Sequence, residues 1–282
     1  MRRLTEIARE RDTMSTVVEL TGAFEGIASM HISQIKDQVL ASQQFFDELW
    51  RIYSQIRVSK DFNFGRKAGL RPINKELLIL ITAEGSFSGD IDQRVVAAAL
   101  EAYDPNQFYV VVIGSHGAMQ LLHAGVHYVR SFRLPSADRN FNVQPLVALI
   151  PQYKSTVVYY PAYVSLTRQE VRYIQMSALV TEMGENVKET EDTISERTYI
   201  FEPSTLAVVD HLERSMVSIM LGQIILDSKL AQYASRFRAM HAARDKADES
   251  FRGLRTSYNQ AHRWLKDERA KEVINGLRRK QA

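Results

Sequence analysis

Apolar side chains recur at alternating intervals of four and three residues through both ends of the chain. In the C-terminal part the pattern runs without interruption from Leu212 to Leu265, and only Gln223 and Arg244 are strongly polar within it. A repeat that averages about 3.5 residues keeps one stripe facing a partner as two helices supercoil. We therefore expect a long helix from about residue 206 to 277, with this stripe as one half of a coiled coil.

The N-terminal part carries a similar stripe with one irregular step. Its positions are Met14, Val17, Thr21, Phe24 and Ala28, and after the irregular step Ile32, Ile35, Val39, Ser42, Phe46, Leu49, Tyr53 and Ile56. A helix from about residue 3 to 57 would be roughly 80 Å long, and the C-terminal helix roughly 105 Å. Because neither fits inside a compact domain, we expect the two stripes to face each other in an extended antiparallel coiled coil.

Proline divides the chain into three parts. All seven prolines lie between positions 72 and 203, so two proline-free arms flank a proline-containing middle. Ser204, directly after Pro203, is the expected N-cap of the C-terminal helix. The predicted organisation is an N-terminal arm at 1–70, a globular domain at 71–203 and a C-terminal arm at 204–282.

The middle part alternates short apolar runs with amphipathic stretches. The expected elements are strands at 76–82, 108–113 and 156–160, helices at 90–103 and 114–125, and further alternating runs at 170–178 and 198–202. A strand–helix–strand–helix order implies a parallel sheet with covered faces. Residues 182–197 are expected to form a loop or a hairpin. The predicted fold class is therefore α/β: a long antiparallel coiled coil with an inserted Rossmann-like domain.

The loop after the first expected strand has the outline of a phosphate-binding turn. A Walker-type loop needs lysine followed by serine or threonine, and a dinucleotide fingerprint needs three glycines at fixed spacing. Gly85-Ser-Phe-Ser-Gly89 has neither feature. Glu84, Asp90 and Asp92 would also surround a phosphate with negative charge. We expect an ordinary strand-to-helix turn and no bound nucleotide.

Histidines of the second expected helix give two further candidates for chemistry. His123 and His127 have the spacing of a zinc pair, but no acidic third ligand is nearby in sequence. Ser115 and His116 suggest a nucleophile and a base, but no local residue would orient the histidine. We expect no catalytic, metal or cofactor site, and a histidine pair that is exposed or half-buried.

Composition and charge narrow the class of protein. The chain has 282 residues, 45% hydrophobic and 24% charged, as in globular proteins, and no cysteine. No run of about 18 apolar residues occurs, so neither membrane insertion nor export is expected. Residues 236–282 carry a net charge of +7 and the remainder −4. A nucleic-acid-binding coiled-coil protein that uses the basic C-terminal arm is therefore the alternative hypothesis.

Short stretches over nearly the whole chain match, in order, the motifs of one known family. Leu20-Thr-Gly-Ala-Phe-Glu-Gly-Ile-Ala-Ser29 resembles I-T-K-A-M-E-M-V-A-A, Val111-Val-Ile-Gly-Ser-His-Gly117 resembles V-V-I-G-x-x-G, and Tyr159-Tyr-Pro-Ala-Tyr-Val-Ser165 resembles V-Y-N-K-F-x-S. Tyr199-Ile-Phe-Glu-Pro-Ser204 is similar to Y-x-F/Y-E-P-x, and Leu226-Asp-Ser228, Arg236-Phe-Arg-Ala-Met240 and Tyr258-Asn-Gln-Ala261 to L-E-S, R-M-V-A-M and Y-N-K-A. The chain thus resembles the gamma subunit of the F-type ATP synthase, the central rotor stalk.

The resemblance implies a noncatalytic rotor of a proton- or sodium-translocating complex, peripheral on the cytoplasmic side of the cell membrane. The implied partners are the alpha and beta subunits of a hexamer, the epsilon subunit and the membrane c-ring, without nucleic acid or cofactor. The implied hexamer contacts are Phe24, Arg236, Met240, Tyr258, Asn259, His262 and Arg263, and the implied membrane-side foot is Tyr199, Phe201 and Glu202. Phe24, Met240 and Tyr258 also lie on the apolar stripes, so a purely internal role stays open for them.

The chain also departs from the family pattern. Gly85-Ser-Phe-Ser-Gly-Asp-Ile91 stands where the family has G-L-C-G-G-F-N. Ala261-His-Arg-Trp-Leu-Lys-Asp-Glu-Arg269 stands where it has A-R-Q-A-A-I-T-Q-E, and His262, Arg263 and Asp267 replace residues that meet a catalytic-subunit loop. Because the C-terminal arm is the longer one by roughly 17 residues, its turns from about Tyr258 are expected to extend beyond the coiled coil as a single helix.

Overall fold

The computed structural model describes residues 4–55, 73–85, 87–135, 141–176, 202 and 204–281. Two long helices stand at the ends of the chain: α1 spans Leu4–Gln55 and α6 spans Thr205–Gln281. The hydroxyl oxygen of Ser204 accepts a hydrogen bond from the Ala207 amide at 3.2 Å, which confirms the predicted N-cap of α6. Among the described residues, no helix has an apolar stretch that is long enough to span a bilayer.

The chain forms two compact units, each containing a stretch of both long helices. Unit 1 consists of Met1–Ala28 and Phe237–Ala282, and unit 2 consists of Ser29–Arg236. Within each unit α1 and α6 run antiparallel, because positions further along α1 meet positions earlier in α6. The pairs that show this are Arg11 with Tyr258 and Glu25 with Arg244 in unit 1, and residues clustered around Ile35 with Leu230 and Phe46 with Leu221 in unit 2.

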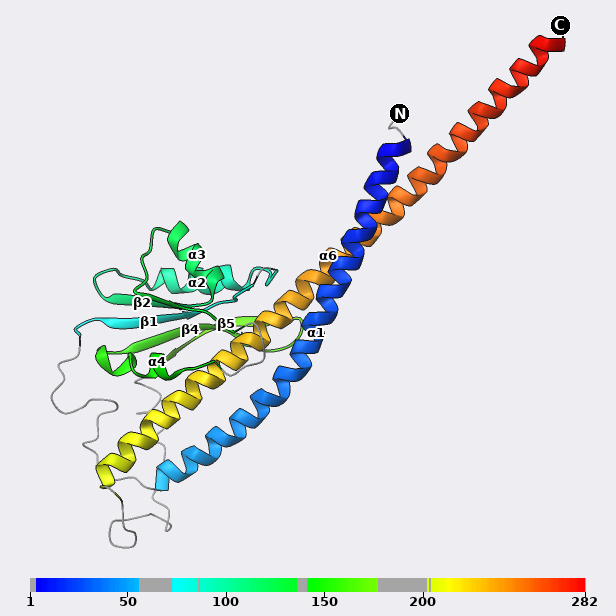
Figure 1. Ribbon diagram of the computed structural model, residues 1–282. Coiled ribbons are helices and arrows are strands. Elements are labelled where there is room, and N and C mark those ends of the chain that lie inside the picture. Colours follow the sequence, from blue (N-terminus) through cyan, green and yellow to red (C-terminus); the bar gives the residue numbers. More distant parts are fainter. Residues whose placement is uncertain are drawn as a thin grey trace. The chain divides into compact units, whose positions relative to one another are not determined.

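A five-stranded sheet lies in unit 2, with the strand order β3-β2-β1-β4-β5 (Figure 1). The strands are β1 at Glu76–Ile81, β2 at Phe108–Ile113, β3 at Arg130–Phe132, β4 at Thr156–Tyr163 and β5 at Gln169–Gln175. The first four pair in parallel, whereas β5 runs antiparallel to β4. The predicted parallel sheet is confirmed, and the alternating run near residue 170 supplies its antiparallel edge strand.

Helices cover both faces of this sheet (Figure 1). One face carries α2 at Ile91–Glu101 and α3 at Ser115–His123; the other carries α4 at Gln144–Val147, the 3-10 helix η1 at Ile150–Gln152 and part of α6. In β1, Leu78 and Leu80 pack with α2 and α3, while Leu77 and Ile79 belong to the cluster that contains Leu221 of α6. Because successive strand residues point to opposite faces, a strand covered on both sides needs an uninterrupted apolar sequence.

In the part of the chain that the structure describes, three short elements were not predicted from the sequence. They are β3, α4 and η1, with three, four and three residues. Segments of this length contain less than about two periods of a helix or strand pattern, so hydrophobic periodicity cannot predict them. Of the earlier predictions, the loop at 182–197 and most of the run at 198–202 lie outside the described residues, as do the side chains of Tyr53 and Ile56.

Unit 1 is a two-helix coiled coil, and its α6 stripe agrees with the prediction. Met240 and Ala247 are buried, and Phe251, Leu254 and Tyr258 are partly buried. All five stand at the expected alternating spacing of four and three residues. The α6 half of the seam was therefore predictable from hydrophobic periodicity alone.

The α1 half of that seam corrects the prediction at two positions. Val17 and Phe24 are 37% and 38% exposed, whereas Val18 is partly buried and the Glu25 side chain is 14% exposed. The observed interface positions are Ile7, Arg11, Met14, Val18, Thr21, Glu25 and Ala28, which alternate without the irregular step. At residues 24 and 25 the prediction was wrong because it followed the more apolar residue, whereas the interface accepts a carboxylate that α6 can pair. At residues 17 and 18 both side chains are valine, so hydrophobicity could not distinguish them.

Candidate partner surfaces and the strand-end cluster

An apolar stripe faces outward on α1 in unit 1. It consists of Val17, Leu20, Phe24 and Ile27, whose exposed fractions lie between 37% and 53%. The spacing of three and four residues places these side chains on one face of the helix, next to the interface with α6 rather than within it. Large apolar residues that are aligned and exposed commonly mark a protein–protein contact.

A charged cluster joins the two helices beside this stripe. Glu25 of α1 lies 3.0 Å from His241 Nδ1 and 3.1 Å from Arg244 Nη1, both on α6. The other imidazole nitrogen of His241 is 3.6 Å from Asp245. Burial raises the pKa of Glu25, but hydrogen bonds from Arg244 and His241 outweigh it and lower the pKa below its ordinary value. Glu25 therefore carries its charge inside the helix pair.

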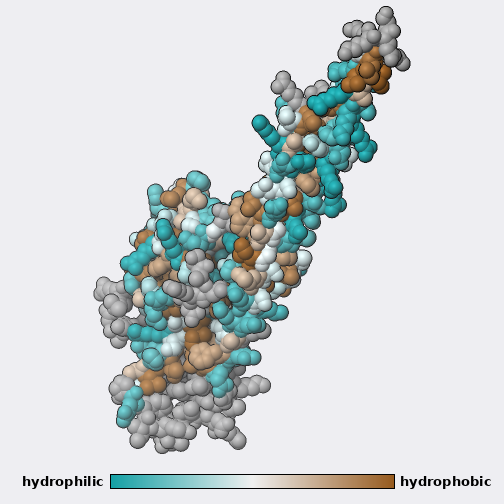
Figure 2. Space-filling view, turned by 45° about the vertical axis from the view of Figure 1, so that its right-hand side comes forward, coloured by the Kyte–Doolittle hydropathy of each residue, from teal (hydrophilic) through white to brown (hydrophobic). Residues whose placement is uncertain are grey.

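Among the described residues of unit 1, no element covers the last turns of α6. All positions from Lys266 to Leu277 are exposed. Val273, Ile274 and Leu277 form an apolar group there, each more than half exposed, and an apolar patch among polar side chains is visible near the C-terminal end of the chain (Figure 2). The expected single helix is observed, but it begins after Leu265 rather than near Tyr258.

Tyr258 and His262 occupy the boundary of this region. The Arg11 guanidinium of α1 lies 4.6 Å from the centre of the Tyr258 ring, and the Tyr258 ring stacks on His262 at 5.9 Å. A cation over an aromatic face is held by the ring quadrupole. Tyr258 therefore takes part in the contact between α1 and α6 and stays partly accessible, while Asn259 and Arg263 are exposed.

Met240 and Arg236 are placed internally by the structure. Met240 is 7% exposed and fills a seam position in unit 1. Arg236, in unit 2, stacks over Tyr233 at 5.3 Å, and one guanidinium nitrogen lies 3.3 Å from where a Cβ on Gly85 would be. Tyr233 also stacks on His31 of α1 at 4.6 Å. Arg236 thus connects α6 to the loop after β1, a contact that sequence spacing does not reveal.

The three residues of the implied membrane-side foot are described only in part. Glu202 is exposed, and Tyr199 and Phe201 lie outside the described residues. Nearer the sheet, Asp227 of α6 accepts a hydrogen bond from the Tyr163 amide at the end of β4. Burial raises the pKa of Asp227, against the opposing effects of that amide and of Arg172. Asp227 therefore joins α6 to the sheet within unit 2.

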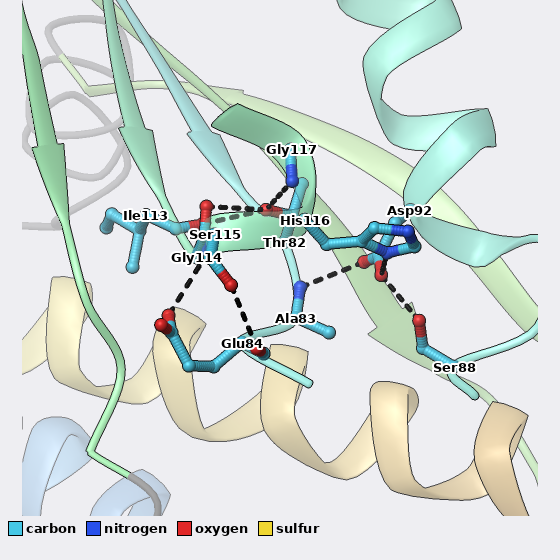
Figure 3. Close-up of polar contacts among 10 residues, drawn as sticks. All are labelled: Thr82, Ala83, Glu84, Ser88, Asp92, Ile113, Gly114, Ser115, His116 and Gly117. Atoms are coloured by element: carbon cyan, nitrogen blue, oxygen red, sulfur yellow. Dashed lines mark hydrogen bonds and ion pairs between the residues drawn. The ribbon is translucent and has the colours of Figure 1, made fainter. Parts of the chain in front are cut away.

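The ends of β1 and β2 hold a polar cluster where a Rossmann domain would bind phosphate (Figure 3). Glu84 Oε2 accepts hydrogen bonds from the backbone amides of Ser115 and Leu134, both at 3.2 Å. Ser115 is the first residue of α3, so a carboxylate of the chain itself occupies the helix N-terminus that would attract an anion. The amides that an anion would use at this helix start are therefore paired with the chain's own carboxylate.

Asp92 organises the other half of the cluster. This buried carboxylate accepts from the Ala83 amide at 3.0 Å and from the Ser88 hydroxyl at 2.6 Å, and it lies 2.8 Å from His116 Nδ1. His116 therefore has an orienting acid 24 residues away, which sequence reasoning missed because the partner is not local. Ser88 donates to Asp92 and Ser115 to the Glu84 carbonyl, so neither hydroxyl proton is directed at the imidazole (Figure 3).

The histidine pair expected to be exposed or half-buried is exposed. His123 and His127 both lie on the surface of unit 2. Across the described ranges, no group of three histidine or acidic side chains is arranged to hold a metal ion. The structure thus offers partner surfaces on the helices and internal polar contacts in the domain.

The chain is similar to known proteins along almost its full length. A family model described as ATP synthase matches residues 3–264. The ATP synthase gamma chain of Cytophaga hutchinsonii is 21% identical, covering 97% of both chains, and that of an Exiguobacterium species is 22% identical, covering 98% of both. The rotor of the Euglena gracilis mitochondrial ATP synthase has the same fold, with a TM-score of 0.62, 14% identity and coverage of 93% of this chain and 99% of that one.

Paired long helices with an inserted α/β domain define the class of stalk-type proteins. The family match and the relatives specify which stalk it is. The chain belongs to the ATP synthase gamma family. It is a central-stalk subunit, a component of the ATP synthase complex rather than its catalytic part.

Proposed function

We propose that this gamma subunit is the rotor that couples ion flow through a membrane ring to ATP synthesis or hydrolysis in a hexamer of alpha and beta subunits. The observation that carries the proposal is the apolar surface left over on the two helices. After α1 and α6 have paired, Val17, Leu20, Phe24 and Ile27 still face outward, and so does the end of α6. A soluble helix pair gains nothing from this exposure unless a partner covers it.

The coupling follows from asymmetry of the helix pair. The helix pair presents different features around and along its axis: the apolar stripe on α1, the Glu25 cluster and the basic α6 surface. Each enclosing subunit would therefore meet a different surface. A contact shifts a conformational equilibrium only by its difference in affinity for the two states. A turning shaft therefore gives the open and closed forms of each catalytic subunit different energies in succession.

The hexamer contacts proposed here follow exposure in the structure. Phe24, Asn259, His262 and Arg263 lie on accessible or partly accessible surface and are assigned to the enclosing subunits. Met240, Tyr258 and Arg236 have contacts within their own units, so their contribution is to hold the helices in position. The basic end of α6 is assigned to carboxylates of the surrounding subunits.

The membrane-side contacts are assigned to the three residues of the implied foot. Glu202, together with Tyr199 and Phe201, is proposed to meet the epsilon subunit and the ion-translocating c-ring. The complex is proposed to lie on the cytoplasmic side of the cell membrane, with protons or sodium ions as the coupling ion. Torque would then enter through the α/β domain and reach the catalytic subunits through α1 and α6.

Cross-linking in the assembled complex tests this assignment. The chain has no cysteine, so single cysteines can be introduced at Glu202 and at Arg263. We expect the cysteine at 202, when oxidised to a cysteine in a static subunit, to stop ATP-driven ion pumping, and reduction to restore it. A cysteine at Arg263 should cross-link to a catalytic subunit, and only one of the catalytic subunits in each complex should be linked.

Two results would reject the rotor proposal. The first is full pumping by complexes that are linked at position 202. The second is purification of the chain without alpha and beta subunits, together with salt-dependent binding to random duplex DNA, which would favour the nucleic-acid alternative. An unlinked complex that carries both cysteines provides the control for damage by the substitutions themselves.

A further inference from the structure

A hollow of about 420 Å³ lies between α1 and α6 in unit 2. Its third wall is formed by Phe141 and Val143, which lie just before α4. Most of the other lining side chains are apolar, and they include Ile35, Phe45, Ile219, Ile225 and Leu226. Proteins commonly bind small molecules in pockets of this size that are mainly apolar and carry a few polar groups.

The charged end of the hollow lies at Lys229. Because Ile35 of α1 clusters with Leu230 of α6, this level of the helix pair is where Lys229 stands, and Gln38 follows Ile35 by about one turn. Among the described lining residues, Lys229 is the only one with a charged side chain. Lys229 already interacts with its surroundings, but an ammonium group has three N–H donors, so it can also pair with an anionic ligand group.

The opposite end of the hollow is apolar. The Gln144 side chain donates a hydrogen bond to the Ser218 hydroxyl at 3.4 Å, which brings the segment before α4 against this part of α6. Phe141 and Ile219 therefore line this end. From Ile219 to Lys229 the helix rises about 15 Å, at 1.5 Å per residue. An extended saturated chain gains about 1.25 Å per carbon–carbon bond, so about ten carbons and a carboxylate span most of this distance.

Gly222 keeps the middle of the hollow open. Glycine destabilises the interior of a helix relative to alanine. A Cβ on Gly222 would have no neighbour within 4 Å, so no contact of the described fold requires glycine at this position. The missing side chain leaves space that packing within the described chain does not use, and a ligand in the hollow would lie against the α6 backbone here.

We propose that this hollow binds a single-chain amphipathic anion, with its hydrocarbon against Phe141 and Ile219 and its carboxylate toward Lys229. The lone charged lining group favours an anion, and the distance between the two ends favours a chain of about ten carbons. The apolar lining supplies most of the binding free energy. This site belongs to the chain by itself, so it goes beyond the rotor proposal and does not depend on it.

Isothermal titration of the full-length chain with decanoate tests the site, at concentrations below those at which decanoate forms micelles. We expect one site per chain with a Kd of about 0.1 mM, as for a well-buried ligand of this size. Decanol has the same hydrocarbon chain without the charge and is titrated in parallel.

Filling the hollow should remove the binding of both compounds. Gly222→Leu should raise both Kd values by at least about tenfold, because the leucine side chain takes the space of the ligand. Gly253→Leu is the matched control, since Gly253 stands on the same helix in unit 1 with no atom within 4 Å of its added Cβ, and it should leave both Kd values unchanged. Circular dichroism and thermal unfolding check that both variants keep their helix content.

Removing the lysine charge should affect only the anion. Lys229→Met keeps an unbranched side chain and should raise the Kd for decanoate by about three- to fivefold, as expected for loss of a partly exposed ion pair. The Kd for decanol should stay at the parent value. Lys266→Met removes an exposed lysine from the uncovered part of α6 and should change neither Kd.

The outcomes decide both the place and the chemistry of the site. Loss of binding in Gly222→Leu, together with an anion-specific loss in Lys229→Met, supports the proposal. Unchanged decanoate binding in Gly222→Leu overturns it, because the ligand would then occupy another surface. The absence of decanoate binding to the parent chain also overturns it, and equal losses for decanoate and decanol in Lys229→Met overturn the assignment of an anion.

Discussion

Gly117 lies against Thr82 where β2 passes into α3. The Gly117 amide donates to the Thr82 hydroxyl at 3.0 Å, and that hydroxyl donates to the Ile113 carbonyl at 2.9 Å. A Cβ on Gly117 would lie 2.5 Å from the same hydroxyl oxygen. This glycine is therefore required by the close approach of α3 to β1, and any side chain would push the helix away from the strand.

Replacing Gly117 by alanine tests this close contact. We expect Gly117→Ala to lower the free energy of unfolding by about 1–3 kcal/mol, because the added methyl group overpacks a buried site. Gly253→Ala is the matched control, since a Cβ on Gly253 has no neighbour within 4 Å and alanine favours a helix by up to about 1 kcal/mol. Urea unfolding followed by circular dichroism measures both, and equal effects of the two substitutions would contradict the packing argument.

At the scale of the element, α6 changes its role along its length. In unit 2 it is buried on several sides, because it meets both α1 and the sheet. In unit 1 only one stripe is covered, and from Lys266 to Leu277 every position is exposed. One continuous helix thus contains a core segment, a coiled-coil segment and an uncovered segment, and a given residue type should have a different energetic weight in each.

Alanine substitution of two leucines in α6 tests how the contribution to stability differs between these segments. Leu230 is 3% exposed and packs with Ile35 and Val39 of α1, so Leu230→Ala should cost about 2–5 kcal/mol of stability. Leu277 is 59% exposed, and Leu277→Ala should change stability by no more than about 0.5 kcal/mol. Thermal or urea unfolding of the two variants gives the comparison, and similar losses would show that the helix pairing in unit 2 is misassigned.

At the scale of the whole molecule, the gamma subunit carries an exposed apolar stripe on α1 and closes the strand ends of its domain with its own carboxylates. Glu84 and Asp92 fill the positions at which a Rossmann-like domain would receive a phosphate or a cation-bound ligand. Under the proposed rotor function, this subunit would affect nucleotide chemistry through its contacts with other subunits. Its own sheet serves as a support for α6.

The isolated full-length chain should therefore bind no nucleotide. Isothermal titration with Mg-ATP up to ~1 mM should give no heat beyond dilution, because the chain's own carboxylates occupy the amides and repel phosphate. Glu84→Gln should leave this result unchanged, since the amide oxygen can keep accepting from the same backbone groups. Saturable binding at micromolar Mg-ATP would contradict the structural account of the loop.

Much of this architecture was determined by the sequence through local periodicity. The α6 stripe, the Ser204 cap, the strands at Glu76–Ile81 and Phe108–Ile113 and the two-arm organisation each depend on residues that are close together in the chain. Such patterns reflect the 3.5-residue and two-residue repeats that a buried stripe or strand face requires. The absence of a nucleotide motif was predictable for the same reason, since motifs of that kind are also local.

Only the tertiary structure decided which of two apolar faces α1 buries and which charged residues are internal. Val17 and Phe24 are as apolar as the seam residues, but Val18 and Glu25 are the ones that face α6, and Glu25 is paired there with residues more than 200 positions away. The same holds for Asp92 with His116 and for Arg236 beside Gly85. Hydrophobic periodicity compares the faces of a helix only by the apolar side chains that each face carries. The stability of a buried charge depends instead on a partner that is distant in the sequence, so the local pattern cannot reveal it.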